Sequence, residues 1–203
     1  EISAVAPHMP SFHKFLFWVG IEGLSPEDWQ YRVMDDGKQL APIAYGAARG
    51  LAKWLGAHHD ATPRAIAYGI AWAERVRPVL NGDAGLWVDW DLVHLYQRAD
   101  DPRKATEILS KVIKAKKNEF WVWAQAGRLY RDAQPELALA CFCRAAECPS
   151  KAEYKVKLHL ELAQILANEQ QYAQASREVT LAEASYSSQG WRLPRELEEM
   201  ISS

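Results

Sequence analysis

The second half of this sequence carries an internal repeat, and the repeat limits the possible folds more than any other feature. Segment 86–96 recurs thirty-four positions later as segment 120–130, and the two agree at a tryptophan, a valine, a leucine and a tyrosine. A period of about 34 residues is typical of arrays in which helical hairpins stack side by side. Each hairpin contacts mainly its neighbours, so the stack presents a long surface and seldom encloses a reaction centre. The repeat therefore predicts an all-α fold that binds a partner.

Capping residues followed by proline mark several helix starts. Asp101-Pro102 and Thr62-Pro63 each place a side-chain oxygen at the N-cap and a proline in the first turn, where the missing N–H costs nothing. Ser25-Pro26 predicts a short helix in the same way. Ser150 and Glu153 have the spacing of a capping box. These signals, combined with the spacing of the apolar residues, predict the helix boundaries.

Most of the chain is predicted to be helical. The predicted helices are 11–22, 41–57, 63–80, 86–98, 102–116, 119–133, 135–147, 151–168, 171–187 and 194–201. No stretch alternates apolar and polar residues as a half-buried strand would. Glycine, asparagine and aspartate instead predict turns at 33–37 and 81–85.

Length and composition exclude several classes of protein. The chain has 203 residues, of which 49% are hydrophobic, enough for a continuous core. A formal net charge of −2 excludes a uniformly basic or acidic binder. No apolar run reaches the roughly 18–20 residues needed to cross a bilayer, and no secretory leader is present, so we expect a cytoplasmic protein without membrane contact. The start at Glu1 predicts a piece of a longer polypeptide, with residues 1–10 as a linker remnant.

The sequence predicts no catalytic, cofactor or metal site. Cys141 and Cys143 on one helix would point about 200° apart, and Cys141 with Cys148 would supply only two ligands, so reduced thiols are the simpler interpretation. His58-His59-Asp60 is expected in an exposed turn. No glycine-rich phosphate loop, nucleophile elbow or His-Glu-x-x-His motif occurs. We therefore expect a protein that is not an enzyme.

Residues 86–187 resemble three tetratricopeptide repeats. The positions that carry the resemblance are Leu92, Tyr96, Ala105 and Leu109 in the first unit, Ala126, Gly127, Tyr130, Ala138, Phe142 and Ala145 in the second, and Leu162, Ala163, Leu166, Ala175, Val179 and Ala182 in the third. Small residues such as Gly127 and Ala138 fall where two helix axes must approach within about 8–10 Å. The resemblance implies a right-handed superhelix of antiparallel helical hairpins. Residues 11–85 would form an N-terminal helical cap with a degenerate hairpin, and residues 188–203 a C-terminal capping helix.

The resemblance also implies a concave groove lined by the first helix of each repeat. The positions that would face this groove repeat at a spacing that keeps them on one helix face. The predicted partner-binding residues are Trp87, Trp90, His94, Arg98, Trp121, Arg128, Arg131, Lys157 and Gln164. Aromatic rings beside cationic side chains suit a partner that carries a carboxylate and an apolar side chain. Trp123 is expected in the core, whereas Trp87 and Trp121 could lie in the groove or in the core.

Charge is unevenly distributed. Between Arg103 and Lys157 the chain has twelve Lys and Arg but only six Asp and Glu. Three interpretations stay open: the lysines lie on solvated outer faces, they attract acidic peptide tails, or they follow RNA or single-stranded DNA. Tryptophan and arginine also stack on bases, so composition does not separate the last two.

A narrower resemblance covers most of the chain. The motifs that carry it are 11–20, 24–29, 116–123, 139–145, 154–157 and Gly190-Trp191. They resemble the tetratricopeptide-like domain of bacterial TOTE conflict-system proteins. This resemblance implies a non-catalytic helical module of a longer protein, often joined to a small nucleic-acid-binding barrel and used in defence against phages.

These observations predict an interaction scaffold that binds a protein or peptide through an aromatic and basic groove. The competing function is RNA or single-stranded nucleic-acid binding by the basic helices 102–157, through this or a neighbouring domain. A structural homodimer is the third hypothesis, because the chain has more aromatic residues than a core of this size needs.

Overall fold

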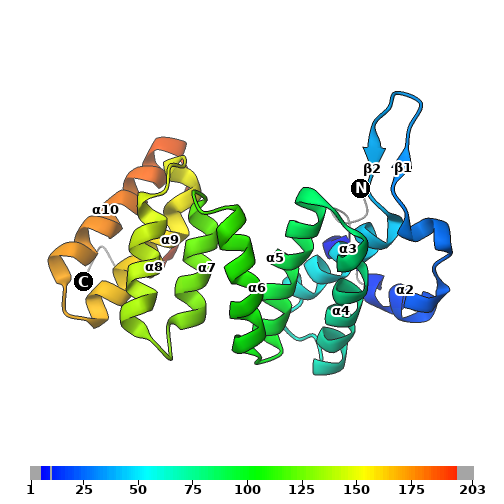
Figure 1. Ribbon diagram of the computed structural model, residues 1–203. Coiled ribbons are helices and arrows are strands. Elements are labelled where there is room, and N and C mark those ends of the chain that lie inside the picture. The colour runs from blue at the N-terminus through cyan, green and yellow to red at the C-terminus, as the bar shows by residue number, and fades with distance from the viewer. Residues whose placement is uncertain (1–5, 10, 196–203) are drawn as a thin grey trace. The chain divides into compact units, whose positions relative to one another are not determined.

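The computed structural model describes residues 6–9 and 11–195 (Figure 1). By its internal contacts the chain divides into two compact units, residues 1–112 and 113–203, which are described separately below. Nearly all of the regular structure in the described residues is helical, as predicted. Among these residues no helix has both the length and the apolar character needed to cross a bilayer.

The first unit begins with short helices and a β-hairpin, and continues with longer helices. Its elements are η1 (Ala6–His8), α2 (Phe12–Val19), η2 (Ile21–Gly23), η3 (Pro26–Trp29), β1 (Arg32–Val33), β2 (Gln39–Leu40), α3 (Ile43–Ala57), α4 (Pro63–Val76), η4 (Arg77–Val79) and α5 (Gly82–Arg98). Helix α6 (Pro102–Ala115) runs across the division between the units.

The second unit consists of two helical hairpins. Its helices are α7 (Phe120–Tyr130), α8 (Pro135–Glu147), α9 (Ala152–Asn168) and α10 (Tyr172–Gln189). Helix α7 packs on α8, and α9 packs on α10, as the repeat predicts. The predicted helix 194–201 lies almost entirely outside the described residues.

The observed helix caps confirm most of the sequence signals. The Thr62 hydroxyl accepts a hydrogen bond from the Ala65 N–H at 3.3 Å, and the Asp101 carboxylate accepts one from the Lys104 N–H at 3.1 Å. The predicted cap at Ser150 is wrong. Lys151 is the N-cap of α9 instead, and its side chain makes no capping hydrogen bond.

The turn predicted at 33–37 is confirmed, but the short strands that flank it were not predicted. Segment 33–37 is the tip of an antiparallel hairpin in which Arg32 pairs with Leu40 and Val33 with Gln39, and this hairpin projects from the rest of its unit (Figure 1). The strands have only two residues each and are exposed on both faces, so they show no alternation of apolar and polar residues.

The predicted turn at 81–85 is wrong because α5 already starts at Gly82. Asparagine, aspartate and glycine favour turns, but tertiary packing overrides that preference here. Gly85 is buried, and a Cβ atom at this position would lie 2.8 Å from Nη1 of Arg77. The close approach of Arg77 therefore leaves no room for a side chain in the first turn of α5, which accounts for a glycine at this position.

The core of the first unit forms where α3, α4 and α5 meet. Helix α3 contributes an apolar stripe to this core, and the stripe is buried. Its members are Ala47, Ala48, Leu51 and Leu55. Gly69 of α4 allows close contact, because a Cβ atom there would overlap Leu55. Trp72 of α4 is completely buried in the same core.

The N-terminal helix α2 is held on α3 and α4 by aromatic rings. His13 stacks on Trp54 with ring centroids 4.0 Å apart, and Phe17 stacks on Tyr68 at the same distance. The Tyr68 hydroxyl also donates a hydrogen bond to the Leu16 carbonyl at 2.7 Å. Helix α2 therefore covers part of the α3–α4 pair, which is what an N-terminal cap would do.

In the second unit, residues from all four helices share one core. Its buried members are Ala124, Ala138, Phe142, Ala145, Leu158, Leu162, Leu166 and Ala175. Phe142 is fully buried and lies against Gly127, where α7 and α8 cross. Trp123 is half-buried and packs against this core, as predicted. The small residues that the repeat pattern places at helix crossings are thus buried as expected.

Replacing Gly127 with alanine is expected to destabilise the protein by about 1–3 kcal/mol. The new Cβ atom would lie 2.7 Å from two ring carbons of Phe142, whose ring is buried on all sides. This overlap should outweigh the gain of roughly 1 kcal/mol in helix propensity. Gly46→Ala in α3 is the control, because its Cβ atom would meet nothing within 4 Å. In urea denaturation, the free energy of unfolding should fall for Gly127→Ala and rise for Gly46→Ala. Equal stabilisation by both substitutions would contradict the close crossing of α7 and α8.

Candidate functional site

The predicted partner-binding residues fall into two groups, because α5 belongs to the first unit and α7 and α9 to the second. In the first group, Trp87, Trp90 and His94 are half-buried on α5. Trp90 and His94 meet edge to face with ring centroids 4.7 Å apart. The guanidinium of Arg49 lies 5.4 Å from the centroid of Trp87. These rings are therefore partly occupied by contacts inside their own unit.

Arg98, the fourth predicted residue of α5, caps the C-terminal end of α3. Its guanidinium donates hydrogen bonds to the carbonyl of Leu55 and to those of His58 and His59, the latter two at 3.1 and 3.3 Å. Carbonyls at a helix C-terminus lack partners within the helix, and a cation is favoured beside them. This contact holds α5 against α3, a role that the sequence analysis did not foresee.

Sequence reasoning also missed two buried carboxylates on α5. Asp91 accepts hydrogen bonds from Arg49 of α3, with distances of 2.7 Å to Nε and 3.4 Å to Nη2. Burial raises the pKa of Asp91 to about 6, against the opposing effect of the Arg49 guanidinium. At neutral pH the pair is therefore ionised and bridges α3 and α5.

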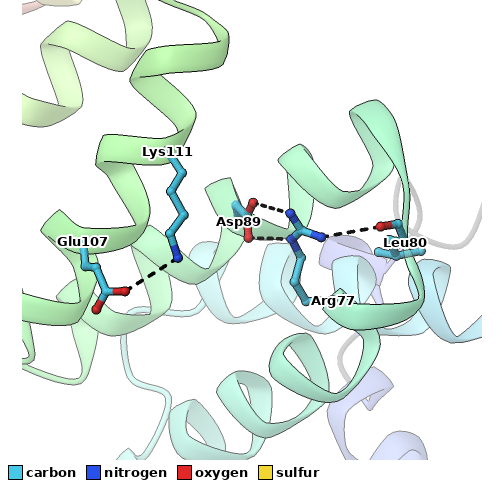
Figure 2. A network of polar contacts seen from close by, with 5 residues as sticks. All are labelled: Arg77, Leu80, Asp89, Glu107 and Lys111. Atoms are coloured by element: carbon cyan, nitrogen blue, oxygen red, sulfur yellow. Dashed lines mark hydrogen bonds and ion pairs between the residues drawn. The ribbon is translucent and has the colours of Figure 1, made fainter.

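Asp89 forms the second buried pair, shown in Figure 2. Arg77 donates to both carboxylate oxygens of Asp89, at 2.7 and 3.0 Å, and also to the Leu80 carbonyl at 3.5 Å. The hydrogen bond to Asp89 raises the pKa of Arg77. The Lys111–Glu107 pair in the same figure is exposed on both sides, so it contributes little. The signal for both buried pairs was an Asp-x-Asp motif inside an otherwise apolar helix.

In the second unit, the predicted residue Arg128 of α7 is paired with a residue that was not predicted. Its Nε lies 3.0 Å from both carboxylate oxygens of Glu161 on α9, and Nη2 lies 2.9 Å from one of them. Nη1 also donates to the Gln125 side-chain carbonyl at 3.4 Å. This bidentate pair joins the first helices of two consecutive hairpins and neutralises the Arg128 charge.

A pocket of about 150 Å³ lies beside this pair, between the end of α7, the start of α8 and the end of α9. We call it the α7–α9 pocket. Its polar lining comes from Arg131, Glu161, Gln164, Asn168 and Glu169, and its apolar lining from Pro135, Ala138 and Ile165. Two predicted partner-binding residues, Arg131 and Gln164, thus meet in one pocket, and Arg128 joins them through Glu161.

Arg131 is the cationic residue that lines this pocket. Its guanidinium carbon lies 5.5 Å from the centroid of the Phe142 ring, which orients the side chain. Within the described part of the chain no Asp or Glu forms an ion pair with Arg131. Arg131 is exposed to solvent. It can therefore bind a carboxylate of a partner.

The amides of the pocket are paired with each other. The side chain of Gln164 donates a hydrogen bond to the side-chain oxygen of Asn168 at 3.1 Å. One turn of α9 separates the two residues, so this bond aligns both amides along the pocket wall. Ile165 lies between them in the sequence and adds apolar surface.

The remaining two predicted residues do not line the pocket. Trp121 is half-buried in α7, and Lys157 is exposed on α9. Their role in partner binding stays a prediction. Lys155, which contributed to the expected basic stretch, is buried, and its ammonium group donates to the Ala146 carbonyl at 2.6 Å. It caps the C-terminal end of α8, so the exposed basic surface is smaller than the sequence implied.

The cysteines do not form a reactive or metal-binding cluster. Cys141 and Cys148 are buried while Cys143 is exposed, which agrees with the helical spacing. Burial raises the pKa of the Cys141 thiol, and burial together with Glu178 and Glu147 raises that of Cys143. A raised thiol pKa lowers the fraction of the nucleophilic thiolate at neutral pH. In residues 6–9 and 11–195, no group of three or more His, Cys, Asp and Glu could hold a metal ion.

The fold is similar to that of solved structures of MamA, a tetratricopeptide-repeat protein. "MamA 41-end from Desulfovibrio magneticus RS-1" is 16% identical, with a TM-score of 0.52, over 72% of this chain and 87% of that chain. "MamA RS-1 ArsTM double mutant" has the same identity and TM-score, over 72% of this chain and 86% of that one. The likeness shows an all-α, tetratricopeptide-repeat-like fold, as predicted.

Sequence comparison adds a family. A family model described as "Domain of unknown function (DUF7017)" matches residues 86–203, which is more than half of the chain. The match covers the three predicted repeats and the C-terminal segment. No curated protein sequence matches the chain.

Proposed function

Because the chain belongs to the family described as "Domain of unknown function (DUF7017)" and has a tetratricopeptide-repeat-like fold, we propose that it is an interaction scaffold for a protein partner. The partner contributes an extended peptide segment, which lies along the first helices of the second unit, α7 and α9. The scaffold itself carries out no reaction. Stacked hairpins support this role because they expose an extended surface on a rigid frame.

The observation that carries the proposal is the α7–α9 pocket with Arg131, which has no ion-pair partner among residues 6–9 and 11–195. A binding site needs apolar area for affinity and a few placed polar groups for specificity. This pocket combines Pro135, Ala138 and Ile165 with a guanidinium and two aligned amides. The Arg128–Glu161 pair stiffens the wall on which these groups stand. The site is thus held in shape before a partner arrives, which lowers the entropy lost on binding.

The proposed biological setting follows the motif resemblance. We place the chain in the cytoplasm as a module of a longer protein of the TOTE conflict-system type, where it would bring a partner to the defence machinery. The resemblance of motifs such as 11–20 and 116–123 supports this setting. Deletion of the segment encoding this chain from such a system should abolish protection against phage while leaving the abundance of the remaining protein unchanged.

The binding function can be tested without knowing the partner. A display library of random peptides is selected on the immobilised chain, and enriched peptides are then measured by calorimetry. We expect a shared motif and dissociation constants near the micromolar range, about −8 kcal/mol, as for a pocket plus an open groove. When the best peptide is bound, the backbone amides of α7 and α9 should exchange their hydrogens more slowly than in the free chain. Absence of any enriched peptide, or protection confined to α8 and α10, would reject the proposal.

Nucleic-acid binding is the competing outcome. Lys111, Lys114 and Lys117 are exposed on and after α6, so an oligonucleotide could contact them. Such binding falls steeply with salt and needs no defined base sequence. A single-stranded oligonucleotide titrated at 50 and 200 mM salt separates the two functions. Tight, salt-sensitive binding of the oligonucleotide together with no peptide enrichment would favour this alternative.

A further inference from the structure

We infer that the α7–α9 pocket selects a peptide segment with one acidic side chain beside an apolar one, and that Arg131 determines this specificity. The inference rests on the proposed function and names the ligand of its site. It follows from the charges of the pocket, from its amides and from its apolar lining.

The charges favour a single carboxylate. Arg128 and Glu161 neutralise each other through three short contacts, so neither offers a net charge to a ligand. Arg131 remains as the cation of the pocket, and Glu169 stands at the same pocket as an anion. A ligand with one negative charge can pair with Arg131 and stay clear of Glu169. A run of phosphates or acidic residues would add negative charge to a pocket that Glu169 also lines, and like charges repel.

The amide pair matches a peptide backbone. Gln164 and Asn168 use one donor and one acceptor in their mutual hydrogen bond. Each amide carries both kinds of group, so the pair leaves donor and acceptor capacity open whichever way the amides are turned. An extended peptide presents an N–H and a C=O at each residue and can satisfy both. The pocket therefore binds the backbone at Gln164 and Asn168 while Arg131 binds a side chain.

The apolar lining favours an aliphatic neighbouring side chain. Pro135, Ala138 and Ile165 line the pocket beside its polar groups. An aliphatic side chain placed against them would be removed from water, which favours binding. The selected motif is thus an acidic residue next to an aliphatic one.

The test uses charge reversal at Arg131. The peptide library is selected in parallel on the wild-type chain, on Arg131→Glu and on the control Arg144→Gln, which removes an exposed arginine of α8 outside the pocket. We expect the wild type and the control to enrich Asp or Glu at one motif position. Arg131→Glu should enrich Lys or Arg at that position instead.

Affinity gives a second readout. Arg131→Gln should weaken the best acidic peptide by roughly tenfold or more, as expected when a charge-assisted hydrogen bond is lost. Replacing the acidic residue of the peptide should weaken wild-type binding similarly and barely affect Arg131→Gln. Because Arg131 is exposed, thermal melts of its variants should match the wild type.

The outcomes separate this inference from the proposed function. If the wild type enriches no peptide, the proposed function fails and the inference fails with it. If it enriches peptides without an acidic position, or if Arg131→Glu retains the same acidic preference, only the inference is overturned. If Arg131→Gln binds the acidic peptide as tightly as the wild type does, Arg131 is not the specificity residue.

Discussion

Replacement of Arg49 by methionine is expected to destabilise the protein by about 3–5 kcal/mol at pH 7.5, because Asp91 would keep a buried charge without a partner. Both side chains of the pair are largely buried, with 15% and 10% of their surfaces exposed. Methionine keeps an unbranched apolar side chain at this position but loses the guanidinium, whose carbon lies 5.4 and 5.9 Å from the centroids of the Trp87 and Tyr45 rings. A double variant, described below, therefore separates the charge pair from these ring contacts. Urea denaturation at 25 °C measures the loss of stability.

The same variant should show a pH dependence of known sign. The pKa of Asp91 is raised from 3.8 to about 6 in the folded protein, so the folded state binds this proton more readily than the unfolded state. The contribution of Asp91 to stability is full below pH 3.8 and is lost as the pH rises through 6. The Arg49 guanidinium lowers this pKa, so its removal should raise the pKa of Asp91 further. The stability that protonated Asp91 contributes should then be lost at a higher pH than in the wild type. The defect of Arg49→Met should thus be smaller at pH 5 than at pH 7.5.

Two further variants make this prediction decisive. Arg49→Met combined with Asp91→Leu removes both charges, so it should recover much of the lost stability. Arg32→Met removes an exposed arginine that pairs with Asp28 at 3.5 Å, and its effect should stay within about 0.5 kcal/mol. A loss of equal size at both pH values, without recovery in the double variant, would mean that Arg49 acts through packing alone.

Phe142→Ala is expected to lower the free energy of unfolding by a comparable amount, about 3–5 kcal/mol. The ring is fully buried in the core of the second unit, in contact with the position of Gly127. Truncation leaves a cavity at the crossing of α7 and α8, which a rigid helix pair cannot fill. Because the ring also lies under the Arg131 guanidinium, the variant should weaken peptide binding as well.

Leu137→Ala is the matched control for Phe142. It lies on the same helix, but 41% of its surface is exposed, so its truncation should cost well under half as much. Chemical denaturation gives the stabilities, and hydrogen exchange shows whether α7 and α8 open first in Phe142→Ala. Similar losses for the two variants would contradict the repeat register that places Phe142 between helices.

Local signals in the sequence predicted the helical hairpins well. The 34-residue period, the proline and N-cap pairs and the small residues at helix crossings all depend on neighbours a few positions apart. The helices at 135–147 and 102–116 accordingly match the observed α8 and α6 to within one residue. The start of α5 was missed because Gly82 and Gly85 favour a turn locally, whereas Gly85 leaves room for Arg77, and no local pattern encodes that close approach.

The candidate site was predicted in part for the same reason. Helical spacing placed Arg128, Arg131 and Gln164 on related faces. Arg131 and Gln164 line one pocket, and Arg128 pairs with Glu161, another residue of its lining. Helical spacing in the sequence could not show that Glu161 neutralises Arg128, since the two residues are 33 positions apart. Nor could it show that Lys155 and Arg98 serve as helix caps inside the units.

The sequence by itself determined the fold class, because stacked hairpins follow from a short repeat of apolar and small residues along the chain. Only the tertiary structure decided which charges are available to a partner. Arg49 and Asp91 are 42 positions apart, and Arg128 pairs with Glu161 of α9, whereas Arg131, the C-cap of α7, is exposed. The interaction energy of a charged side chain depends on its distance to other charges, and its pKa depends on its burial. Both the distances and the burial are set only when the helices pack.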